Sequence, residues 1–321
     1  MKRGIFVVFV VLVSFLNAKN IIDIYRFKGI KSVQKALDKD LKSQKFWENY
    51  LKDYNTSCGY FEDEKYLIKS DKELKKMDVF HITNGKVKKL ATYNIIVGKN
   101  GEKKREGDLV TPVGVYKILL HFKPLNTFYG PIAFVLSYPN LYDKLQGRDG
   151  HGIWIHGYPI DDESRPNRTK GCLVLKNDQL LDLNSTIKPY KTYVAISEKH
   201  FESAKRSNIA KILAFLYDWR DSWAKSDIDR YLSFYSKDFK RFDGKSFEAF
   251  AAMKRRIFAK KGDKSIVFEK ISILPYPNIS GKKLYRIDFY EKYSTKGYKF
   301  NGNKELYVEN NGGKIEILAE K

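Results

Sequence analysis

The spacing of apolar residues divides the chain into regions of different character. Between residues 28 and 56, apolar side chains recur every three or four positions, which is typical of amphipathic helix, and Asn55-Thr56-Ser57 breaks this pattern. From about residue 64 to 197, short runs rich in β-branched and aromatic residues alternate with turn signals such as Asn84-Gly85. We expect strands at residues 79–82, 91–97, 113–122, 132–137, 152–155, 173–175 and 192–196. This middle region is therefore predicted to be mostly β-structure.

The pattern changes again near Ser207. A helical apolar face runs over residues 209–223, and Ser246 is placed to cap a second helix that Gly262 ends. Alternating strands are expected at residues 266–268, 284–290, 306–308 and 315–318. Helices followed by a run of strands favour an α+β sandwich with a concave sheet. The whole chain is thus predicted to be a multidomain α+β protein.

The N-terminus has the pattern of an export signal. Met1-Lys2-Arg3 is positively charged, residues 5–16 are almost wholly apolar, and Asn17-Ala18 follows. Together they indicate a secretory signal peptide, because the apolar run is too short for a good membrane span. An uncleaved anchor is the alternative, since Leu16 is larger than the residue that signal peptidase normally accepts at that position. We therefore expect a protein that acts outside the cytoplasm.

The composition is that of a folded, strongly basic protein. With 321 residues, 43% of them hydrophobic, the chain can bury real cores, and its length favours two or more domains. The formal net charge is +22, which favours an anionic environment such as nucleic acid, anionic lipid or cell-wall polymer. Export argues against nucleic acid. Basic residues are interspersed with acidic ones, which is typical of a solvated surface rather than a dedicated patch.

The two cysteines, Cys58 and Cys172, raise the question of a disulfide. In an oxidising compartment they could form one structural bridge, although a chain of this size does not need it. The sequence around Cys172 favours chemistry instead. An apolar run leads into His156-Gly157, and a polar loop leads into Gly171-Cys172, which another apolar run follows. Two adjacent strands would thus present an imidazole and a thiol at one end of a sheet, whereas Cys58 is expected to be a buried thiol.

A thiol beside an imidazole is the minimum apparatus for acyl transfer. The thiolate of Cys172 is the nucleophile, and His156 is the base that takes its proton. Backbone N–H groups around Gly171 and Cys172 could stabilise an oxyanion, because glycine permits a tight, exposed turn. No Asp or Asn has an obvious claim on the imidazole, so a backbone carbonyl such as that of Gly157 is expected to hold it. The structural alternatives are a satisfied core histidine and a buried or bridged cysteine.

Other residues near this pair have two interpretations each. His151, Trp154 and Tyr158 either line the cleft or simply pack. The nearby basic side chains either bind substrate carboxylates or are solvated loop charges, and we favour binding for Lys170 alone. The basic residues in question are Arg148, Arg165, Arg168 and Lys170. Since His81, His121 and His200 have no motif context, neither a metal site nor a cofactor is expected.

Two ordered motifs resemble those of the L,D-transpeptidase catalytic-domain family. Ile155-His156-Gly157 with Thr169-Lys170-Gly171-Cys172 is similar to the family's active-site signature, and residues 104–116 resemble its glycine–proline segment. The resemblance spans about residues 64 to 197. It implies a β-rich domain that cleaves the bond between meso-diaminopimelate and a terminal D-alanine in a peptidoglycan stem tetrapeptide, with Cys172 acylated and D-alanine leaving.

The resemblance leaves the acceptor open. Water would make the protein an L,D-carboxypeptidase, whereas an amine would make it a transpeptidase that forms crosslinks or exchanges D-amino acids. Many crosslinking members carry His before the Gly-Cys and Arg two residues after the Cys, but this chain has Lys170 and Val174. This departure favours hydrolysis. A non-catalytic wall-binding protein, with Cys172 bridged to Cys58, is the third hypothesis.

The whole layout most resembles the L,D-carboxypeptidases that set helical cell shape in curved Gram-negative bacteria. The resemblance implies a periplasmic protein whose partners are peptidoglycan stem peptides and not nucleic acid. It also implies a dimerising N-terminal segment and a C-terminal NTF2-like pocket that holds a wall fragment or another small ligand. The predicted divisions are a signal peptide at 1–18, a helical segment at 19–63, an L,D-transpeptidase-like domain at 64–199 and an NTF2-like domain at 200–321.

Overall fold

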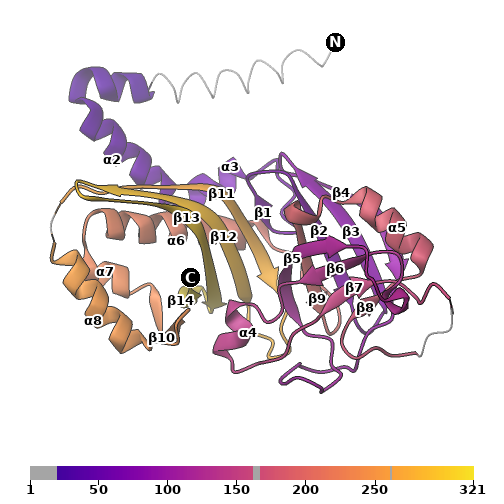
Figure 1. The fold of residues 1–321 in the computed structure, drawn as a ribbon. Coiled ribbons are helices and arrows are strands. Elements are labelled where there is room, and N and C mark those ends of the chain that lie inside the picture. The colour runs from indigo at the N-terminus through magenta and orange to yellow at the C-terminus, as the bar shows by residue number, and fades with distance from the viewer. Residues whose placement is uncertain (1–19, 162–166, 261) are drawn as a thin grey trace, which may run out of the picture.

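Two lobes lie side by side in the structure, a computed structural model that describes residues 20–161, 167–260 and 262–321. Each lobe is built on one β-sheet, and the N-terminal helices lie against the C-terminal lobe (Figure 1). The predicted signal peptide and Arg165 lie outside the described residues. Across the described ranges, the helices are too short or too polar for any of them to cross a bilayer.

Residues 20–28 are helical, and the stretch from 30 to 50, where one continuous pattern was predicted, forms two short helices. They are α2 (Ile30–Leu41) and α3 (Gln44–Tyr50). The break is at Ser43, whose hydroxyl accepts the Phe46 N–H at 3.3 Å and so starts a new helix. Trp47 is buried and stacks on Tyr217 of the C-terminal lobe at 5.4 Å between ring centroids. Burial of this ring anchors the segment to that lobe.

The middle lobe contains an eight-stranded, curled sheet with the order β4-β3-β2-β9-β5-β6-β7-β8. Its first strand, β2, pairs in parallel with its last, β9, so the two ends of the domain meet at the centre of the sheet. The apolar core includes Ile68, Val79, Ile155 and Leu173. The strands are β2 (Lys65–Asp71), β3 (Lys76–Thr83), β4 (Lys86–Asn94), β5 (Gly114–Phe122), β6 (Ala133–Leu136), β7 (Trp154–His156), β8 (Leu173–Val174) and β9 (Thr192–Ser197).

Several elements of this lobe differ from the predicted ones. The strand expected at 152–155 begins only at Trp154, because Gly152 has a φ of +69°, a left-handed conformation that breaks an extended strand. The strand expected at 91–97 ends at Asn94, and Ile96 instead forms an isolated bridge with Val174. The sequence pattern missed β2 and the helical segments η1 (Thr127–Tyr129), α4 (Leu141–Leu145), α5 (Asn177–Thr186) and η2 (Pro189–Lys191).

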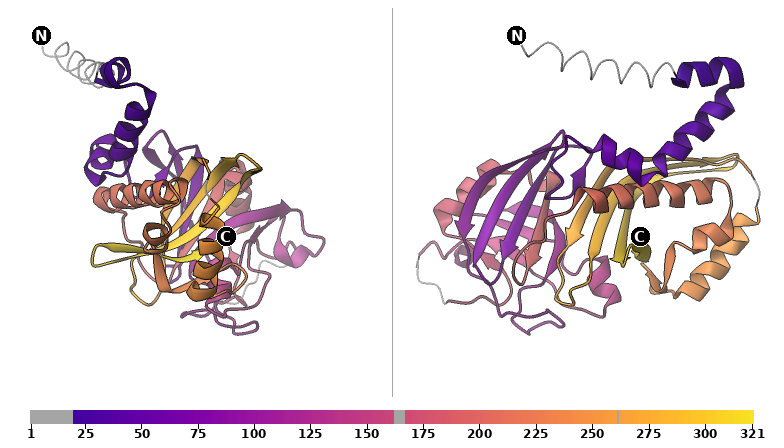
Figure 2. Two further views of the ribbon diagram at one scale, coloured as in Figure 1. Left: turned by 90° about the vertical axis from the view of Figure 1, so that its left-hand side faces the viewer. Right: turned by 180° about the vertical axis from the view of Figure 1, so that it is seen from behind.

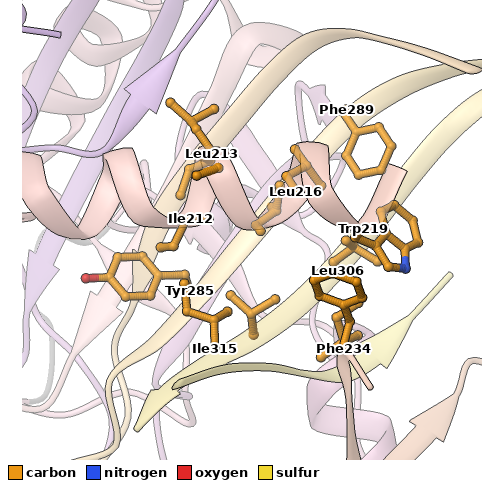
Figure 3. Close-up of a cluster of buried hydrophobic side chains, with 14 of the residues drawn as sticks. Ile212, Leu213, Leu216, Trp219, Phe234, Tyr285, Phe289, Leu306 and Ile315 are labelled. Carbon is orange, nitrogen blue, oxygen red and sulfur yellow. The ribbon is translucent and has the colours of Figure 1, made fainter. Parts of the chain in front are cut away.

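The C-terminal lobe wraps a curved sheet around a long helix. The sheet order is β1-β11-β12-β13-β14-β10, and α6 lies across its concave face, with Leu216 and Trp219 packed between Phe289 and Leu306 (Figure 3). The predicted second helix ends at Phe258, before Gly262. The elements are β1 (Tyr60–Phe61), α6 (Arg206–Ala224), α7 (Ile228–Leu232), β10 (Tyr235–Arg241), α8 (Phe247–Phe258), β11 (Ser265–Tyr276), β12 (Leu284–Thr295), β13 (Tyr298–Asn311) and β14 (Lys314–Glu320).

Buried contacts join the two lobes, which stay adjacent in every view (Figure 2). Apolar side chains from both sides form one cluster, in which Tyr142 stacks on Tyr307 at 5.3 Å between centroids. Polar groups cross the same boundary. The guanidinium of Arg286 donates to the Val115 carbonyl oxygen at 3.0 Å, and the amide of Asn140 donates to the Tyr276 hydroxyl at 2.9 Å. The middle lobe is therefore held against the C-terminal sheet by both apolar and polar contacts.

Candidate active site

The strand register brings His156 and Cys172 to the same face of the sheet. Strands β7 and β8 are parallel, with Ile155 paired to Leu173 and His156 paired to Val174. Cys172 precedes Leu173 and is therefore level with Trp154, two residues before His156. Side chains two positions apart on a strand point the same way. The register therefore places Cys172, which immediately precedes β8, diagonally across from His156, and the imidazole and the thiol are the candidate pair for acyl transfer.

The surroundings of His156 select one tautomer. Its ring is only 2% exposed, and Nδ1 lies 2.9 Å from the Gly157 carbonyl oxygen. A carbonyl oxygen can only accept a hydrogen bond, so the neutral ring carries its proton on Nδ1. Nε2 is then the nitrogen that can take a proton. The ring of Tyr129 packs edge-on against the imidazole at 5.0 Å between centroids and limits its rotation.

Gly157 is fixed by contacts that a larger residue would not allow. Its N–H donates to the Tyr129 carbonyl oxygen at 2.9 Å. A Cβ at this position would lie 2.2 Å from Oδ1 of Asn177, the same atom that accepts the Tyr158 N–H at 2.9 Å. Asn177 and Tyr129 therefore position the carbonyl that holds His156. Sequence analysis missed both, and the only local signal was an asparagine in the first turn after an apolar run.

The loop before Cys172 is organised by one hydroxyl. Thr169 Oγ1 donates to the Cys172 carbonyl oxygen at 2.7 Å and accepts the Gly171 N–H at 3.1 Å. Gly171 has a φ of +124°, which favours glycine. Its N–H, predicted as an oxyanion donor, is thus used within the loop. The partly exposed Cys172 Sγ lies 3.4 Å from the Gly152 carbonyl oxygen and donates to it.

Cys58 lies in a different environment. It is 3% exposed within the apolar cluster between the lobes. No disulfide joins Cys58 and Cys172, both of which are described residues. The arrangement gives no support to a locked pair of cysteines.

The glycine–proline segment builds a support under the Cys172 loop. Gly98 donates its N–H to Thr111 Oγ1 at 2.8 Å. A Cβ at Gly98 would lie 3.0 Å from the Gly171 nitrogen, so the two backbones are in close contact. Thr169 is bound to the backbone next to Gly98, because its N–H donates to the Val97 carbonyl oxygen at 3.0 Å. The second motif thus shapes the site without facing it.

Asp108 holds this supporting segment together. Its carboxylate accepts the Lys103 ammonium at 2.6 Å and the N–H groups of Lys104, Arg105 and Val110. Burial alone would raise the pKa of Asp108, but these donors outweigh it and lower the pKa to about 2. The segment is therefore braced by a carboxylate that stays ionised.

Aromatic rings extend from the imidazole along one side of the site. Trp154 is half-buried and contacts Phe122 and Tyr129, at 5.5 Å and 5.0 Å between ring centroids. Tyr158 is also half-buried, and its N–H is held by Asn177. These rings form a wall beside His156 that can pack against the aliphatic part of a peptide substrate.

The basic residues named from the sequence are placed differently from one another. Lys170 and Arg168 are exposed on the loop before Cys172, where they can reach a ligand. Arg148 is instead mostly buried and pairs with Asp143 at 2.8 Å and with Glu102. Its charge is used inside the lobe, so its role is structural, which is neither of the two interpretations considered for it, a substrate contact or a solvated loop charge. His151 is 78% exposed and lies 3.3 Å from Glu106.

A second cluster of charged groups lies inside the C-terminal lobe. Burial and the neighbouring Glu320 raise the pKa of Glu291 to about 7, against the opposing effect of Lys304. Glu291 is 2% exposed, and its Oε2 has no hydrogen-bond partner among the described residues. Lys254 lies over the rings of Trp223, Tyr231 and Phe250. Sequence analysis missed this cluster, because its members are spread over a helix and three strands.

Family models match both lobes. The L,D-transpeptidase catalytic domain (YkuD) matches residues 65–196, and the Cds6 C-terminal NTF2-like domain matches residues 211–321. The predicted fold class is thereby confirmed for both lobes.

Solved structures of two proteins share this architecture. The helical cell shape determining protein Pgp2 of Campylobacter jejuni is 44% identical and superposes with a TM-score of 0.83, covering 87% of this chain and 99% of that one. Bd1075 of Bdellovibrio bacteriovorus is 26% identical, with a TM-score of 0.65, covering 81% of this chain and 92% of that one.

A curated relative matches over a shorter range. YafK of Escherichia coli K12, which is named as an L,D-transpeptidase, is 32% identical over 89 residues, 27% of this chain. The chain spans about a third of the length of that relative, 35%.

Proposed function

Because the chain belongs to the family of L,D-transpeptidase-domain proteins that includes the helical cell shape determining protein Pgp2, we propose that it is a peptidoglycan L,D-carboxypeptidase that influences cell shape. It removes the terminal D-alanine from stem tetrapeptides by way of an acyl-enzyme on Cys172. The observation that carries this proposal is the shared face of His156 and Cys172, together with the Gly157 carbonyl that sets the imidazole tautomer.

In the first half-reaction the Cys172 thiol gives its proton to Nε2 of His156. The sulfur then attacks the carbonyl carbon that joins meso-diaminopimelate to D-alanine. The C–N bond breaks, the proton passes from His156 to the leaving amine, and the peptide remains on sulfur as a thioester. The Nδ1–H bond to Gly157 stabilises the imidazolium that forms in between.

In the second half-reaction water is the acceptor. His156 takes a proton from the water, whose oxygen attacks the thioester, and the proton returns to sulfur as the tripeptide carboxylate leaves. The backbone N–H of Cys172 is the oxyanion donor that we propose, since the Gly171 N–H is directed to Thr169. Hydrolysis is favoured over crosslinking because Lys170 and Val174 occupy the positions where many crosslinking members of the family have His and Arg.

The setting of the reaction is part of the proposal. The apolar N-terminal run supports export to the periplasm, where the wall is located. Exposed apolar side chains on the N-terminal helices, among them Tyr25, Phe27 and Ile30, support a homodimer formed by that segment. A small ligand in the C-terminal domain is supported by the buried Glu291, whose Oε2 has no hydrogen-bond partner among the described residues, and by the aromatic rings that surround Lys254.

Digestion of purified muropeptides tests the reaction. Wild-type protein should convert tetrapeptides to tripeptides and release D-alanine, as measured by mass, and Cys172→Ala should release none. Cys172→Ser, nearly the same size, is the control for folding. Crosslinked dimers among the products would show that the protein catalyses transpeptidation rather than hydrolysis. Release of D-alanine by Cys172→Ala would refute the proposed nucleophile.

A further inference from the structure

A wide groove lies where the two lobes meet, outside the candidate active site. It has a volume of about 1030 Å³ and is lined by α4 and the following loop on one side and by β10 and β14 on the other. This volume is at the upper end of the range for small-molecule sites, and the walls come from both lobes. The groove therefore fits an extended ligand better than a single small one.

The walls of this junction groove are basic. Five basic side chains and two acidic ones line it. Three of the five, Lys144, Lys237 and Lys240, are exposed, and none of them forms an ion pair with another described residue. The other two are already neutralised, Arg148 by Asp143 and Glu102, and Lys282 by Glu309. The exposed carboxylate of Asp238 offsets one of these charges, and both walls still keep a net positive charge.

One wall of the groove continues along the chain into the active site. Arg148 is followed by Asp149, whose carboxylate accepts the Glu106 N–H at 2.7 Å. Three residues later, the Gly152 carbonyl oxygen accepts the Cys172 thiol. The chain thus leads within four residues from a wall of the groove to the carbonyl that contacts the nucleophile.

We propose that the junction groove binds a carboxylate-bearing stem peptide of the peptidoglycan polymer while Cys172 acts on another stem. This inference rests on the proposed function. Stem peptides carry several carboxylates, and Lys144 lines one wall while Lys237 and Lys240 line the other, so one anionic segment can contact both lobes. Each exposed contact is weak and screened by salt, but a second attachment on the same polymer raises the overall affinity.

The groove therefore distinguishes the intact wall from its soluble fragments. A single muropeptide reaches Cys172 without the second attachment, whereas a sacculus engages both places at once. The enzyme should then bind sacculi in a salt-dependent way and lose this preference when the three lysines are neutralised.

The test compares two triple variants. The first is Lys144→Gln with Lys237→Gln and Lys240→Gln. The matched control is Lys76→Gln with Lys260→Gln and Lys299→Gln, exposed lysines outside the groove lining that change the net charge equally. Binding is measured by co-sedimentation with purified sacculi on a Cys172→Ala background. Turnover is measured with Cys172 present, on soluble tetrapeptide muropeptides.

We expect the groove variant to bind sacculi roughly tenfold more weakly, and the control variant to bind within about twofold of the parent. Turnover of soluble muropeptides should stay within about twofold of wild type for both variants. Equal loss of binding in both variants would show an effect of net charge alone and would overturn the proposal. The proposal would also be overturned if the groove variant lost binding to vesicles of phosphatidylethanolamine and phosphatidylglycerol but still bound sacculi. That result would assign the groove to a lipid surface.

A failure of the proposed function gives a different result. In that case wild-type protein would release no D-alanine from either substrate, although sacculus binding, measured without the nucleophile, could still be compared between variants. Circular dichroism and thermal melting of each triple variant confirm that a lost interaction is not a lost fold.

Discussion

The Thr169 hydroxyl donates a hydrogen bond to the carbonyl oxygen of Cys172 over 2.7 Å, and this bond closes the loop that presents the sulfur. The oxygen of the same hydroxyl accepts the Gly171 N–H at 3.1 Å. One short side chain therefore fixes the backbone on both sides of the proposed nucleophile.

Replacement of Thr169 by valine should lower the turnover number while the protein remains folded. Valine has nearly the same shape but cannot make either bond, and a lost hydrogen bond with an unsatisfied group costs about 1–3 kcal/mol. We expect the rate of D-alanine release to fall about 10- to 100-fold, with a small decrease in Tm. Thr169→Ser keeps the hydroxyl and should retain most activity. Equal activity of the valine and serine variants would contradict this role.

Gly157→Ala should be strongly destabilising and should abolish activity. The added Cβ would lie 2.2 Å from Asn177 Oδ1 and 3.2 Å from a side-chain carbon of Pro131, so the strand end must shift and take its carbonyl away from His156. Overpacking of this kind typically costs about 1–3 kcal/mol. Thermal melting and muropeptide turnover measure the two effects. Gly297→Ala, at a position with nothing within 4 Å of the new Cβ, is the control and should change neither.

His156→Gln tests the proposed base. Glutamine can replace the hydrogen bond to the Gly157 carbonyl but cannot accept and return a proton, so turnover should fall by about 10² to 10⁴. Tm should change little. His200→Asn is a suitable control, because His200 has a φ of +48°, which asparagine tolerates, and lies in another loop. If His156→Gln kept more than half of the wild-type rate, the proton acceptor would have to be another group.

Glu291 should make the stability of the protein depend on pH. Its pKa is about 7 in the folded chain, against an ordinary value of 4.5. Between these values the folded state holds a proton that the unfolded state has lost. The contribution of Glu291 to the free energy of unfolding is therefore complete below about pH 4.5 and is lost as the pH rises through 7. Glu291→Gln cannot ionise, and at about pH 8 its free energy of unfolding should exceed that of wild type by roughly 1–3 kcal/mol.

Chemical denaturation at acidic and alkaline pH measures this difference. Near pH 5 wild type and Glu291→Gln should be almost equally stable, because most of the wild-type penalty has not yet developed. The exposed Glu73→Gln serves as the control and should track wild type at both values. A Glu291→Gln variant that is less stable than wild type at alkaline pH would mean that the ionised carboxylate is stabilised by Lys304 and that the predicted sign is wrong.

The reacting residues of the site could be predicted from the sequence more readily than the residues that position them. Apolar runs next to His156-Gly157 and Gly171-Cys172 indicate two strand ends, and those ends meet in the structure as β7 and β8. Asn177 and Tyr129 could not be assigned in this way, because each acts through a contact that exists only after folding. Local patterns carry no information about which distant backbone atom will approach Gly157.

Helices and strands were likewise predicted where the sequence shows a clear period and missed where it does not. Helix α6 was predicted because its apolar face repeats over several turns, whereas α4 has only five residues and shows no period. Strand β2 was missed because it does not alternate. It lies at the centre of the sheet, and its polar residues Ser70 and Asp71 are buried. The buried ion pair of Arg148 was not foreseen for a related reason, since its partner Asp143 belongs to the helix that the pattern did not show.

Strand β1, formed by Tyr60 and Phe61, pairs with β11 at residues 272 and 273 and so joins the C-terminal sheet before the chain enters the other lobe. The catalytic lobe, although continuous in sequence, is therefore inserted between two pieces of its neighbour. During synthesis the short strand has no pairing partner until β11 has been made. A chain cut between the lobes would leave Phe61 and the edge of β11 exposed to proteases and to aggregation. We therefore expect neither lobe to be stable when it is expressed alone.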